Sequence, residues 1–198
     1  MKEYILNKIQ NEDSDFLPRI IDYACGSGHF LTESIEEIQQ IVDELHFSED
    51  TNIDMILSEY KKSTKWAKDY IFGIEKDYRL ARTSQVACFM HGDGDANIIF
   101  GDGLELWNGK NGQKYYFEDE SFDFLVANPP YSIKDFTKHL NDNKLAKFEL
   151  LNIIRNSESN PDDIEVLFLE RIKQLLKVGG IAGVFFPSSI LSNTGLYT

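Results

Sequence analysis

The sequence predicts an α/β fold with a mostly parallel β-sheet and helices on both faces. Short apolar runs alternate with amphipathic stretches along the 198 residues, which is typical of repeated strand-helix-strand units. Polar residues and glycines follow the apolar runs directly, as expected where parallel strands end at one edge of a sheet. The length is sufficient for one such domain with a core of its own.

Hydrophobic periodicity gives the order of the elements. Apolar residues at spacings of three and four indicate helices, and short apolar runs bounded by glycine, proline or acidic residues indicate strands. Residues 47–69 are polar with intermittent apolar positions and are interpreted as a helical insertion. The expected order is a strand at 19–24, a glycine turn at 25–28, a helix to about 45, the insertion, a strand at 70–75, a helix at about 77–90, and strands at 97–102 and 122–127.

The last third of the chain contains a polar segment and one more helix-strand pair. Residues 132–161 hold one modest apolar patch and are interpreted as a polar, partly ordered loop that could cover a cleft. A helix is expected from about Asp162, with Gly179 and Gly180 as its C-terminal stop. A fifth strand is expected at 181–186. The whole chain is interpreted as one domain.

Charge and composition exclude several classes of protein. The 20 basic and 33 acidic residues give a net charge of −13, which opposes binding to nucleic-acid phosphates by this chain alone. The nearest approach to a basic cluster, at Lys61, Lys62, Lys65 and Lys68, has the spacing of a solvated helix face. The sequence has no apolar run long enough for a membrane span, and its two cysteines indicate neither a disulfide framework nor a metal site. We therefore expect a cytoplasmic protein without a bound metal.

A glycine turn lies between the first strand and its helix. Gly26 and Gly28 would let a ligand approach the backbone, and the helix N-terminus favours a carboxylate or phosphate. The alternative is a tight turn whose glycines serve packing only. Asp22, at the end of the strand, could receive an ammonium group or orient the turn. Cys25 is interpreted as a small packing residue, because no partner base stands near it in the sequence.

Acidic residues end the second and third strands. Glu75 is well placed to accept hydrogen bonds from the two hydroxyls of a ribose. Asp102, followed by Gly103, could accept a hydrogen bond from the exocyclic amine of a nucleoside base. The alternatives are an exposed pair between Glu75 and Lys76, and an ordinary Asp-Gly turn.

The most specific motif is Asn128-Pro129-Pro130-Tyr131, directly after the fourth strand. The amino group of a purine is a poor nucleophile because its lone pair is delocalised into the ring. Two acceptors aimed at its N–H bonds, the Asn128 carboxamide oxygen and the Pro129 carbonyl, would draw it toward tetrahedral geometry. The prolines restrict the backbone that carries these acceptors. Tyr131 offers a face on which an extruded base could stack.

Together these motifs resemble the N6-adenine DNA methyltransferases, particularly the modification subunits of type I restriction-modification systems. The resemblance covers residues 22–31, 73–77, 101–104, 128–131 and 168–188. It implies a Rossmann-like S-adenosylmethionine-dependent methyltransferase fold and methyl transfer to the N6 amine of a flipped DNA adenine. The implied catalytic residues are Asn128, Pro129, Pro130 and Tyr131, and the implied cofactor-binding residues are Asp22, Ala24, Gly26, Ser27, Gly28, His29, Phe30, Glu75, Lys76, Asp102, Gly103 and Asn128.

The resemblance also implies partners, and the chain departs from the family in three places. DNA, a DNA-specificity subunit and a restriction subunit would be the partners. The family usually has proline where this chain has Tyr23, and a cofactor-contacting segment that precedes the first strand in the family has no convincing counterpart in residues 1–18. The family's final antiparallel strands and target-recognition region have no counterpart after the fifth strand, so the resemblance leads us to interpret residues 1–198 as a fragment of a methyltransferase catalytic domain.

Three other functions stay open at the level of sequence. The Asn-Pro-Pro-Tyr motif also serves enzymes that methylate glutamine in release factors, because the nitrogen of a carboxamide is likewise a poor nucleophile. A binding module that keeps the cofactor pocket without activity is a second alternative. A dehydrogenase fits least, because the third glycine of its fingerprint and the early acidic residue are absent.

Overall fold

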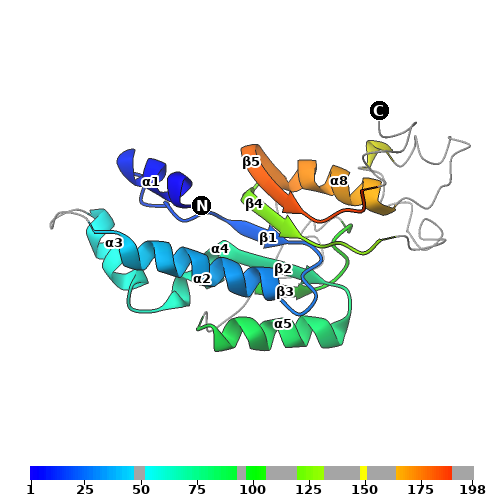
Figure 1. Ribbon diagram of the computed structural model, residues 1–198, viewed down its shortest axis with the longest axis horizontal. Helices are drawn as coiled ribbons and strands as arrows, with labels where there is room; N and C mark the ends of the chain where they lie inside the picture. The colour runs from blue at the N-terminus through cyan, green and yellow to red at the C-terminus, as the bar shows by residue number, and fades with distance from the viewer. Residues whose placement is uncertain (47–51, 93–96, 106–119, 132–147, 151–163, 189–198) are drawn as a thin grey trace, which may run out of the picture.

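The five strands of the computed structural model form one parallel sheet in the order β3-β2-β1-β4-β5 (Figure 1). The structure describes residues 1–46, 52–92, 97–105, 120–131, 148–150 and 164–188. The chain runs outward from β1 to β2 and β3, and then returns to the other side of β1 for β4 and β5. Ligands bind where the strand order reverses in this way, between the carboxyl ends of β1 and β4. The strands are β1 Ile20–Asp22, β2 Ile71–Glu75, β3 Asn97–Phe100, β4 Phe122–Ala127 and β5 Leu176–Val184.

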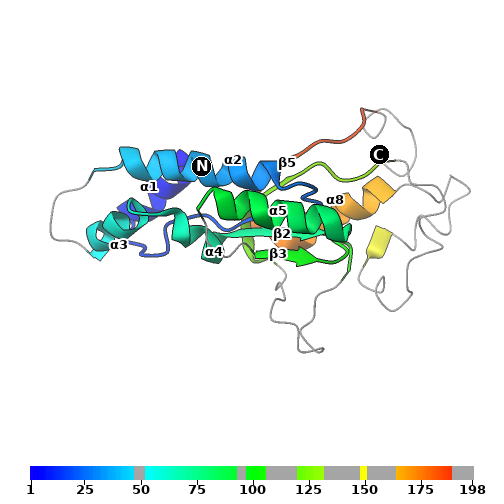
Figure 2. The same ribbon diagram turned by 90° about the horizontal axis from the view of Figure 1, so that it is seen from below.

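Helices cover both faces of the sheet (Figures 1 and 2), so the expected fold class is confirmed. Successive strand residues alternate between two buried cores: Ile20 packs in one and Ile21 in the other. The first core includes the helices α2 His29–Glu44 and α5 Tyr78–Met90, and the second includes α8 Ile164–Leu175. Both faces of the strands are therefore apolar, as parallel sheets require.

The first core also holds helices from two further parts of the chain. Helix α1, Lys2–Gln10, buries Ile5 and Ile9 there, although no element was expected in residues 1–18. Within the segment interpreted as a helical insertion, the structure has α3 Asn52–Tyr60, the short η1 Thr64–Trp66 and α4 Ala67–Tyr70.

The expected stop of the last helix at Gly179 and Gly180 is wrong. Helix α8 ends at Leu175, and β5 begins at the next residue. The register explains the two glycines: Phe122 of β4 pairs with Leu176, whereas Phe124 pairs with Ile181, so β5 carries extra residues between these pairs. Gly179 has a φ of +83°, a conformation that suits glycine in such a bulge.

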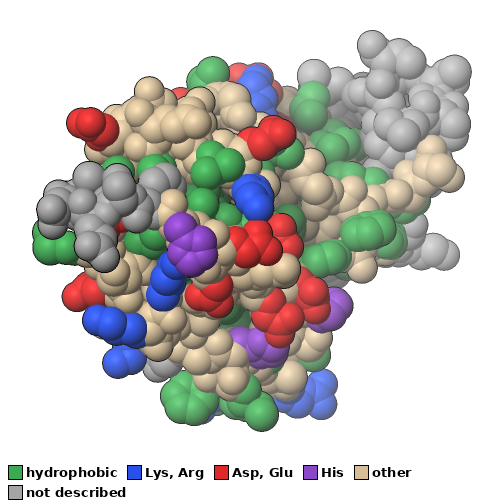
Figure 3. All heavy atoms as spheres, turned by 60° about the vertical axis from the view of Figure 1, so that its left-hand side comes forward, with side chains coloured by type: hydrophobic (Ala, Val, Ile, Leu, Met, Phe, Trp, Pro, Cys, Tyr) green, Lys and Arg blue, Asp and Glu red, His purple; other side chains and the backbone are tan. Residues whose placement is uncertain are grey.

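The outward face of α2 is acidic. Its exposed side chains include Glu33, Glu36, Glu37, Asp43 and Glu44. Figure 3 is turned so that the left-hand side of Figure 1 comes forward. On this face acidic side chains gather, with histidines among them. The Lys2 ammonium lies 2.8 Å from Glu44, and His91 Nδ1 lies 2.9 Å from Glu36. This face would repel the phosphates of DNA. None of the helices in the described residues is long and apolar enough to cross a membrane.

Candidate functional site

The turn after β1 has the backbone conformation that its glycines predict. Gly26 has a φ of +55°, and Gly28, the N-cap of α2, has a φ of +89°. A Cβ on Gly28 would lie 2.4 Å from the Ser84 hydroxyl oxygen of α5, so only glycine lets the two helices approach here. Cys25 of this turn is buried in the first core, which agrees with its interpretation as a packing residue.

The Asp22 carboxylate is buried beneath this turn. Its Oδ1 accepts a hydrogen bond of 2.9 Å from the Ala24 backbone N–H, and the residue is 1% exposed. Burial raises its pKa to about 7; the Ala24 hydrogen bond opposes the shift, and the negative charge of Glu75 adds to it. The sequence suggested that Asp22 could receive an ammonium group or orient the turn. Its hydrogen bond with the Ala24 N–H corresponds to the second of these roles.

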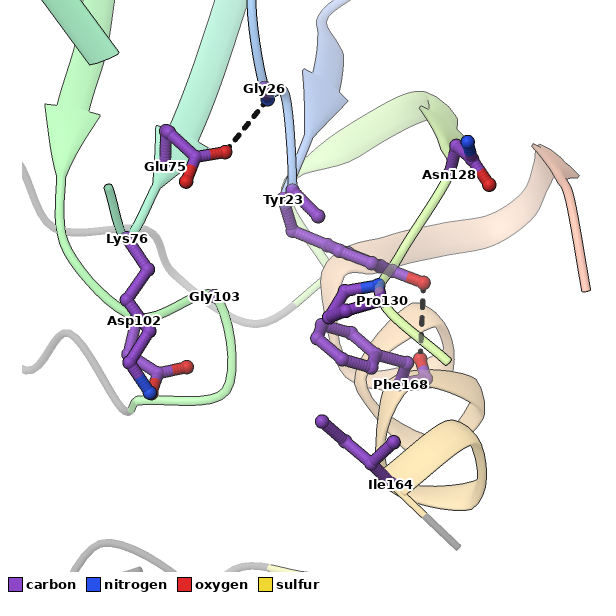
Figure 4. A pocket seen from close by; sticks show the side chains of 11 residues that line it. Tyr23, Gly26, Glu75, Lys76, Asp102, Gly103, Asn128, Pro130, Ile164 and Phe168 are labelled. Carbon is purple, nitrogen blue, oxygen red and sulfur yellow. Dashed lines mark hydrogen bonds and ion pairs between the residues drawn. The ribbon is translucent and has the colours of Figure 1, made fainter. Parts of the chain in front are cut away.

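Glu75 ties β2 to the glycine turn. Its Oε2 accepts a hydrogen bond of 2.8 Å from the Gly26 N–H (Figure 4). Its Oε1 accepts one of 2.7 Å from the Asp77 N–H. Each oxygen of an ionised carboxylate has a second lone pair. Glu75 can therefore hold the turn and accept hydrogen bonds from a ligand at the same time.

The turn after β3 presents a second carboxylate. Asp102 Oδ1 accepts a hydrogen bond of 3.1 Å from the Leu104 N–H, and Oδ2 lies 2.7 Å from the Lys76 ammonium. Next to it, a Cβ on Gly103 would lie 2.1 Å from the Tyr23 carbonyl oxygen. Gly103 thus lets the turns after β1 and β3 pack directly against each other.

The Asn128 to Tyr131 segment leaves the carboxyl end of β4 beside β5. The Tyr131 hydroxyl donates a hydrogen bond to Asn128 Oδ1 and also lies 2.9 Å from the Phe185 carbonyl oxygen. Because a hydroxyl has a single proton, these two acceptors share it. Tyr131 is 38% exposed. The phenol group therefore orients the Asn128 amide while one side of its ring stays open to solvent.

These strand ends enclose a cleft with a volume of about 300 Å³, at the lower end of the range for small-molecule sites. Glu75, Lys76 and Asp102 lie along one side, and Tyr23, Pro130 and Phe168 lie along the other (Figure 4). Eight of the expected site residues therefore come together in its walls: Ala24, Gly26, Glu75, Lys76, Asp102, Gly103, Asn128 and Pro130.

The other expected site residues do not line this cleft. Tyr131 lies beside Asn128, as described above, and Phe30 stacks on the Phe185 ring at a centroid distance of 6.0 Å. His29 is largely exposed and lies 3.8 Å from Glu33. The residues outside the walls of the cleft are Asp22, Ser27, Gly28, His29, Phe30, Pro129 and Tyr131.

Three residues in the walls of the cleft were not predicted from the sequence: Tyr23, Ile164 and Phe168. Tyr23 is the residue that replaces the family's proline; its ring stacks on Phe168 at 5.1 Å, and its hydroxyl donates a hydrogen bond of 3.4 Å to the Phe168 carbonyl. Ile164 and Phe168 stand four residues apart on α8, where their spacing predicts only a buried helix face. No local signal distinguishes this face from an ordinary core face.

The segment expected to cover a cleft lies mostly outside the described residues. Of residues 132–161, the structure describes 148–150: Phe148 is buried in the second core, and the backbone N–H groups of Glu149 and Leu150 donate to the Glu170 carboxylate at 2.6 and 3.1 Å. In the described part of the chain, no three His, Cys, Asp or Glu side chains gather as metal ligands. The cleft itself is lined by two carboxylates, an ammonium group, a carboxamide and aromatic rings.

Comparisons with known proteins agree with this geometry. The chain is 27% identical, over a 203-residue alignment, to the type II restriction enzyme and methyltransferase RM.Eco57I of Escherichia coli, covering 87% of this chain and 20% of that protein. It is similar in structure to a protein assigned as the modification subunit of a type I restriction enzyme from Vibrio vulnificus, with a TM-score of 0.60 at 20% identity, covering 100% of this chain and 36% of that one. A protein assigned as a class I S-adenosylmethionine-dependent methyltransferase from Listeria monocytogenes has a TM-score of 0.57 at 18% identity, covering 96% of this chain and 45% of that one.

The structural likeness shows that the fold is that of the S-adenosylmethionine-dependent methyltransferases. The chain spans less than half the length of each of these relatives. The family described as N-6 DNA Methylase matches residues 3–198, which is nearly the whole chain. The chain therefore belongs to the N-6 DNA Methylase family.

Proposed function

We propose that this chain transfers a methyl group from S-adenosylmethionine to the N6 amine of adenine in DNA, as part of a restriction-modification system. One observation carries the proposal: Asn128 and Pro130 line the same cleft as Glu75 and the Asp102-Gly103 turn. Two hydrogen-bond acceptors suited to a nucleoside, Glu75 and Asp102, therefore line the same cleft as Asn128, an acceptor suited to an amine. Membership of the N-6 DNA Methylase family supports this reading over glutamine methylation.

The residues of the cleft fit S-adenosylmethionine. Glu75 would accept hydrogen bonds from the ribose hydroxyls, and Asp102 with Gly103 would bind the adenine base, with Lys76 beside them. The turn from Asp22 through Ala24, Ser27 and Gly28 to Phe30 would surround the methionine part. Phe168 and Pro130 provide the apolar side that an adenine base needs. When bound, S-adenosylmethionine supplies an electrophilic methyl group.

The segment after β4 would prepare the target amine. Asn128 Oδ1 and the Pro129 carbonyl would accept hydrogen bonds from its two N–H groups and so release the nitrogen lone pair from the ring. Pro130 limits the freedom of this segment. The Tyr131 hydroxyl orients the Asn128 amide, and its ring would stack on the flipped base.

DNA binding is proposed to depend on further protein. A net charge of −13 opposes the phosphate contacts that supply most non-specific affinity. A DNA-specificity subunit would hold the duplex and read its sequence, and a restriction subunit would complete the system. The reaction would take place in the cytoplasm, with its DNA substrate.

Radiolabelled methyl transfer tests the proposal. The chain would be assayed with a specificity subunit on adenine-containing DNA, and separately with release factor as the acceptor. We expect labelled N6-methyladenine in DNA and no labelled release factor. Labelled glutamine would support the alternative enzyme class, and cofactor binding without any transfer would support an inactive binding module.

The variant Asn128→Ala tests which side chain supports the methyl-transfer step. It should abolish methyl transfer and leave the dissociation constant for S-adenosylmethionine unchanged, because its carboxamide serves the amine and not the donor. Asn11→Ala, an exposed asparagine at the end of α1, is the matched control and should retain full activity. Near-normal turnover of Asn128→Ala would refute the proposed mechanism.

A further inference from the structure

A buried guanidinium lies behind the nucleoside end of the cleft. Arg171 of α8 is 2% exposed. Its Nε donates a hydrogen bond of 3.2 Å to the Gly103 carbonyl, and its Nη2 donates one of 3.1 Å to the Glu105 carbonyl. Its Nη1 donates one of 2.9 Å to the Gln174 side chain. Burial of a charged group is costly unless acceptors surround it, so this arrangement needs the backbone of the turn after β3.

The turn held by Arg171 is the one that carries Asp102. Asp102 and Gly103 face the cleft, whereas the Gly103 and Glu105 carbonyls accept hydrogen bonds from Arg171. Asp102 itself accepts a hydrogen bond from the Leu104 N–H, between these two anchored carbonyls. The direction of the Asp102 carboxylate therefore depends on the peptide groups that the guanidinium fixes.

Arg171 also connects the two sides of the cleft. Ile164, Phe168 and Arg171 follow one another at spacings of four and three on α8, which places them on one face of the helix. The first two line the wall opposite Asp102, and the third reaches the turn of Asp102. The hydrogen bonds of Arg171 thus connect the helix that carries the apolar wall to the turn that carries the carboxylate.

The same turn is blocked on its other side. Gly103 packs so closely on Tyr23 that a Cβ would lie 2.1 Å from the Tyr23 carbonyl oxygen. The turn cannot move further toward Tyr23, and its hydrogen bonds to Arg171 resist movement away. The planar fork of arginine suits two carbonyl acceptors at once, which a lysine ammonium on its flexible stem does not reproduce.

We propose that Arg171 is a positioning residue that fixes the Asp102-Gly103 turn against α8 and thereby sets the selectivity of the cleft for an adenine base. The inference rests on the proposed function, because it takes the ligand to be an adenine nucleoside. It assigns to Arg171 no contact with the ligand. Its effect passes through the position of the Asp102 carboxylate, which accepts a hydrogen bond from the exocyclic amine of the base.

The experiment compares two ligands that differ at that amine and in the protonation of the adjacent ring nitrogen. Calorimetry would give the dissociation constants of S-adenosylhomocysteine and of its hypoxanthine analogue, in which a carbonyl oxygen replaces the amine. The wild-type chain should prefer the adenine ligand by about tenfold or more, as expected for a hydrogen bond to a charged acceptor. Arg171→Met keeps much of the side-chain length but removes all donors, and it should reduce this preference toward one.

Two further variants keep the test decisive. Arg171→Lys retains the charge without the fork and should keep only part of the preference, so it replaces Arg171→Met if that variant does not fold. Arg82→Met removes a surface arginine that donates to Gln85 at 2.9 Å and should match the wild type. A merely structural role of Arg171 would weaken both ligands equally and leave their ratio unchanged.

The outcomes separate this inference from the proposed function. Full wild-type preference in Arg171→Met, or in Arg171→Lys where only that variant folds, would overturn the inference and leave the proposed function standing. Equal wild-type affinity for the two ligands would also overturn it, because Asp102 would then not select the base. Failure of the wild-type chain to bind either ligand would contradict the proposed function itself.

Discussion

Glu75 combines a structural role with the ligand-binding role that we propose for it. Its carboxylate accepts from the Gly26 and Asp77 N–H groups, and the cleft leaves it open to a ribose. Glu75→Ala should weaken S-adenosylmethionine binding by roughly 1.5–3 kcal/mol, about 10- to 150-fold in the dissociation constant, because hydrogen bonds to a charged group are lost. Calorimetric titration measures this change.

A neighbouring variant provides the control for Glu75. Asp77 Oδ1 caps α5 by accepting from the Arg79 and Leu80 N–H groups at 2.8 and 3.2 Å. Asp77→Ala should lower the free energy of unfolding by about 1 kcal/mol without changing cofactor affinity. An unchanged affinity in Glu75→Ala would remove Glu75 from the binding site.

The proposed mechanism gives the Tyr131 hydroxyl a measurable part in catalysis. Tyr131→Phe keeps the stacking ring but removes the hydrogen bond that orients Asn128. We expect kcat to fall by about two- to tenfold, the equivalent of one hydrogen bond of roughly 0.5–1.5 kcal/mol, with the S-adenosylmethionine affinity unchanged. Single-turnover methylation assays measure the rate. A loss as large as that of Asn128→Ala would instead give the hydroxyl an essential chemical role.

The buried carboxyl of Asp22 makes stability depend on pH. Its pKa is raised from 3.8 to about 7 in the folded chain, so the folded state binds a proton more tightly than the unfolded state does. This contribution to stability is fully present below about pH 4 and is lost as the pH rises through 7. Asp22→Asn removes the titrating group but keeps an oxygen for the Ala24 N–H.

Thermal unfolding between pH 5 and 8 tests the role of Asp22. The Tm of the wild type should fall relative to that of Asp22→Asn as the pH rises from 5 to about 7, and the difference should level off above that. Other titrating groups shift both proteins equally, so the comparison isolates this carboxyl. A constant difference in Tm at every pH would show that Asp22 is already ionised in the folded chain at pH 5.

At the scale of elements, the site depends on the close approach of two turns. Gly103→Ala would place a Cβ 2.1 Å from the Tyr23 carbonyl oxygen, and the backbone would have to shift. We expect a loss of roughly 1–3 kcal/mol in the free energy of unfolding, as for other overpacked sites, together with weaker cofactor binding. Denaturant unfolding and calorimetry measure the two effects.

The chain provides a matched glycine for this comparison. A Cβ on Gly183 of β5 would meet no atom within 4 Å, so Gly183→Ala should leave stability and cofactor affinity near the wild-type values. If Gly103→Ala and Gly183→Ala have the same stability and the same cofactor affinity, the close packing of the turns after β1 and β3 does not stabilise the site.

The elements also show where prediction from sequence succeeds. The bounds of β4 match the expected strand, and α5 begins within a residue of its expected start, because apolar runs that end at prolines and the periodicity of apolar residues are local signals. The end of α8 was misplaced because a pair of glycines can stop a helix or form a bulge. Only the pairing of β5 with β4 decides between the two.

At the scale of the whole molecule, charge determines how DNA can approach. The chain carries a net charge of −13 and exposes acidic residues along α2. At about 0.15 M salt we expect it to bind DNA more weakly than the usual non-specific range of about 10⁻⁴–10⁻⁶ M. Gel-shift assays with and without a specificity subunit measure this. Tight, sequence-specific binding by the chain alone would contradict the expectation.

The sequence by itself determined the fold class, the order of the strands along the chain and the motifs at their ends. These follow from local periodicity and from residue types whose chemistry does not depend on context, such as the Asn128 to Tyr131 segment. It also determined that eight of the expected site residues would meet, because parallel strands bring their carboxyl ends to one edge.

Only the tertiary structure decided what faces these motifs. Tyr23 and Phe168 stack across 145 positions of sequence, and Arg171 reaches the Gly103 carbonyl from 68 positions away. On α8 these residues have the periodicity of any buried helix face. Their roles depend on which turn the helix packs against, because side chains of one helix face meet whatever the sheet order places beside them.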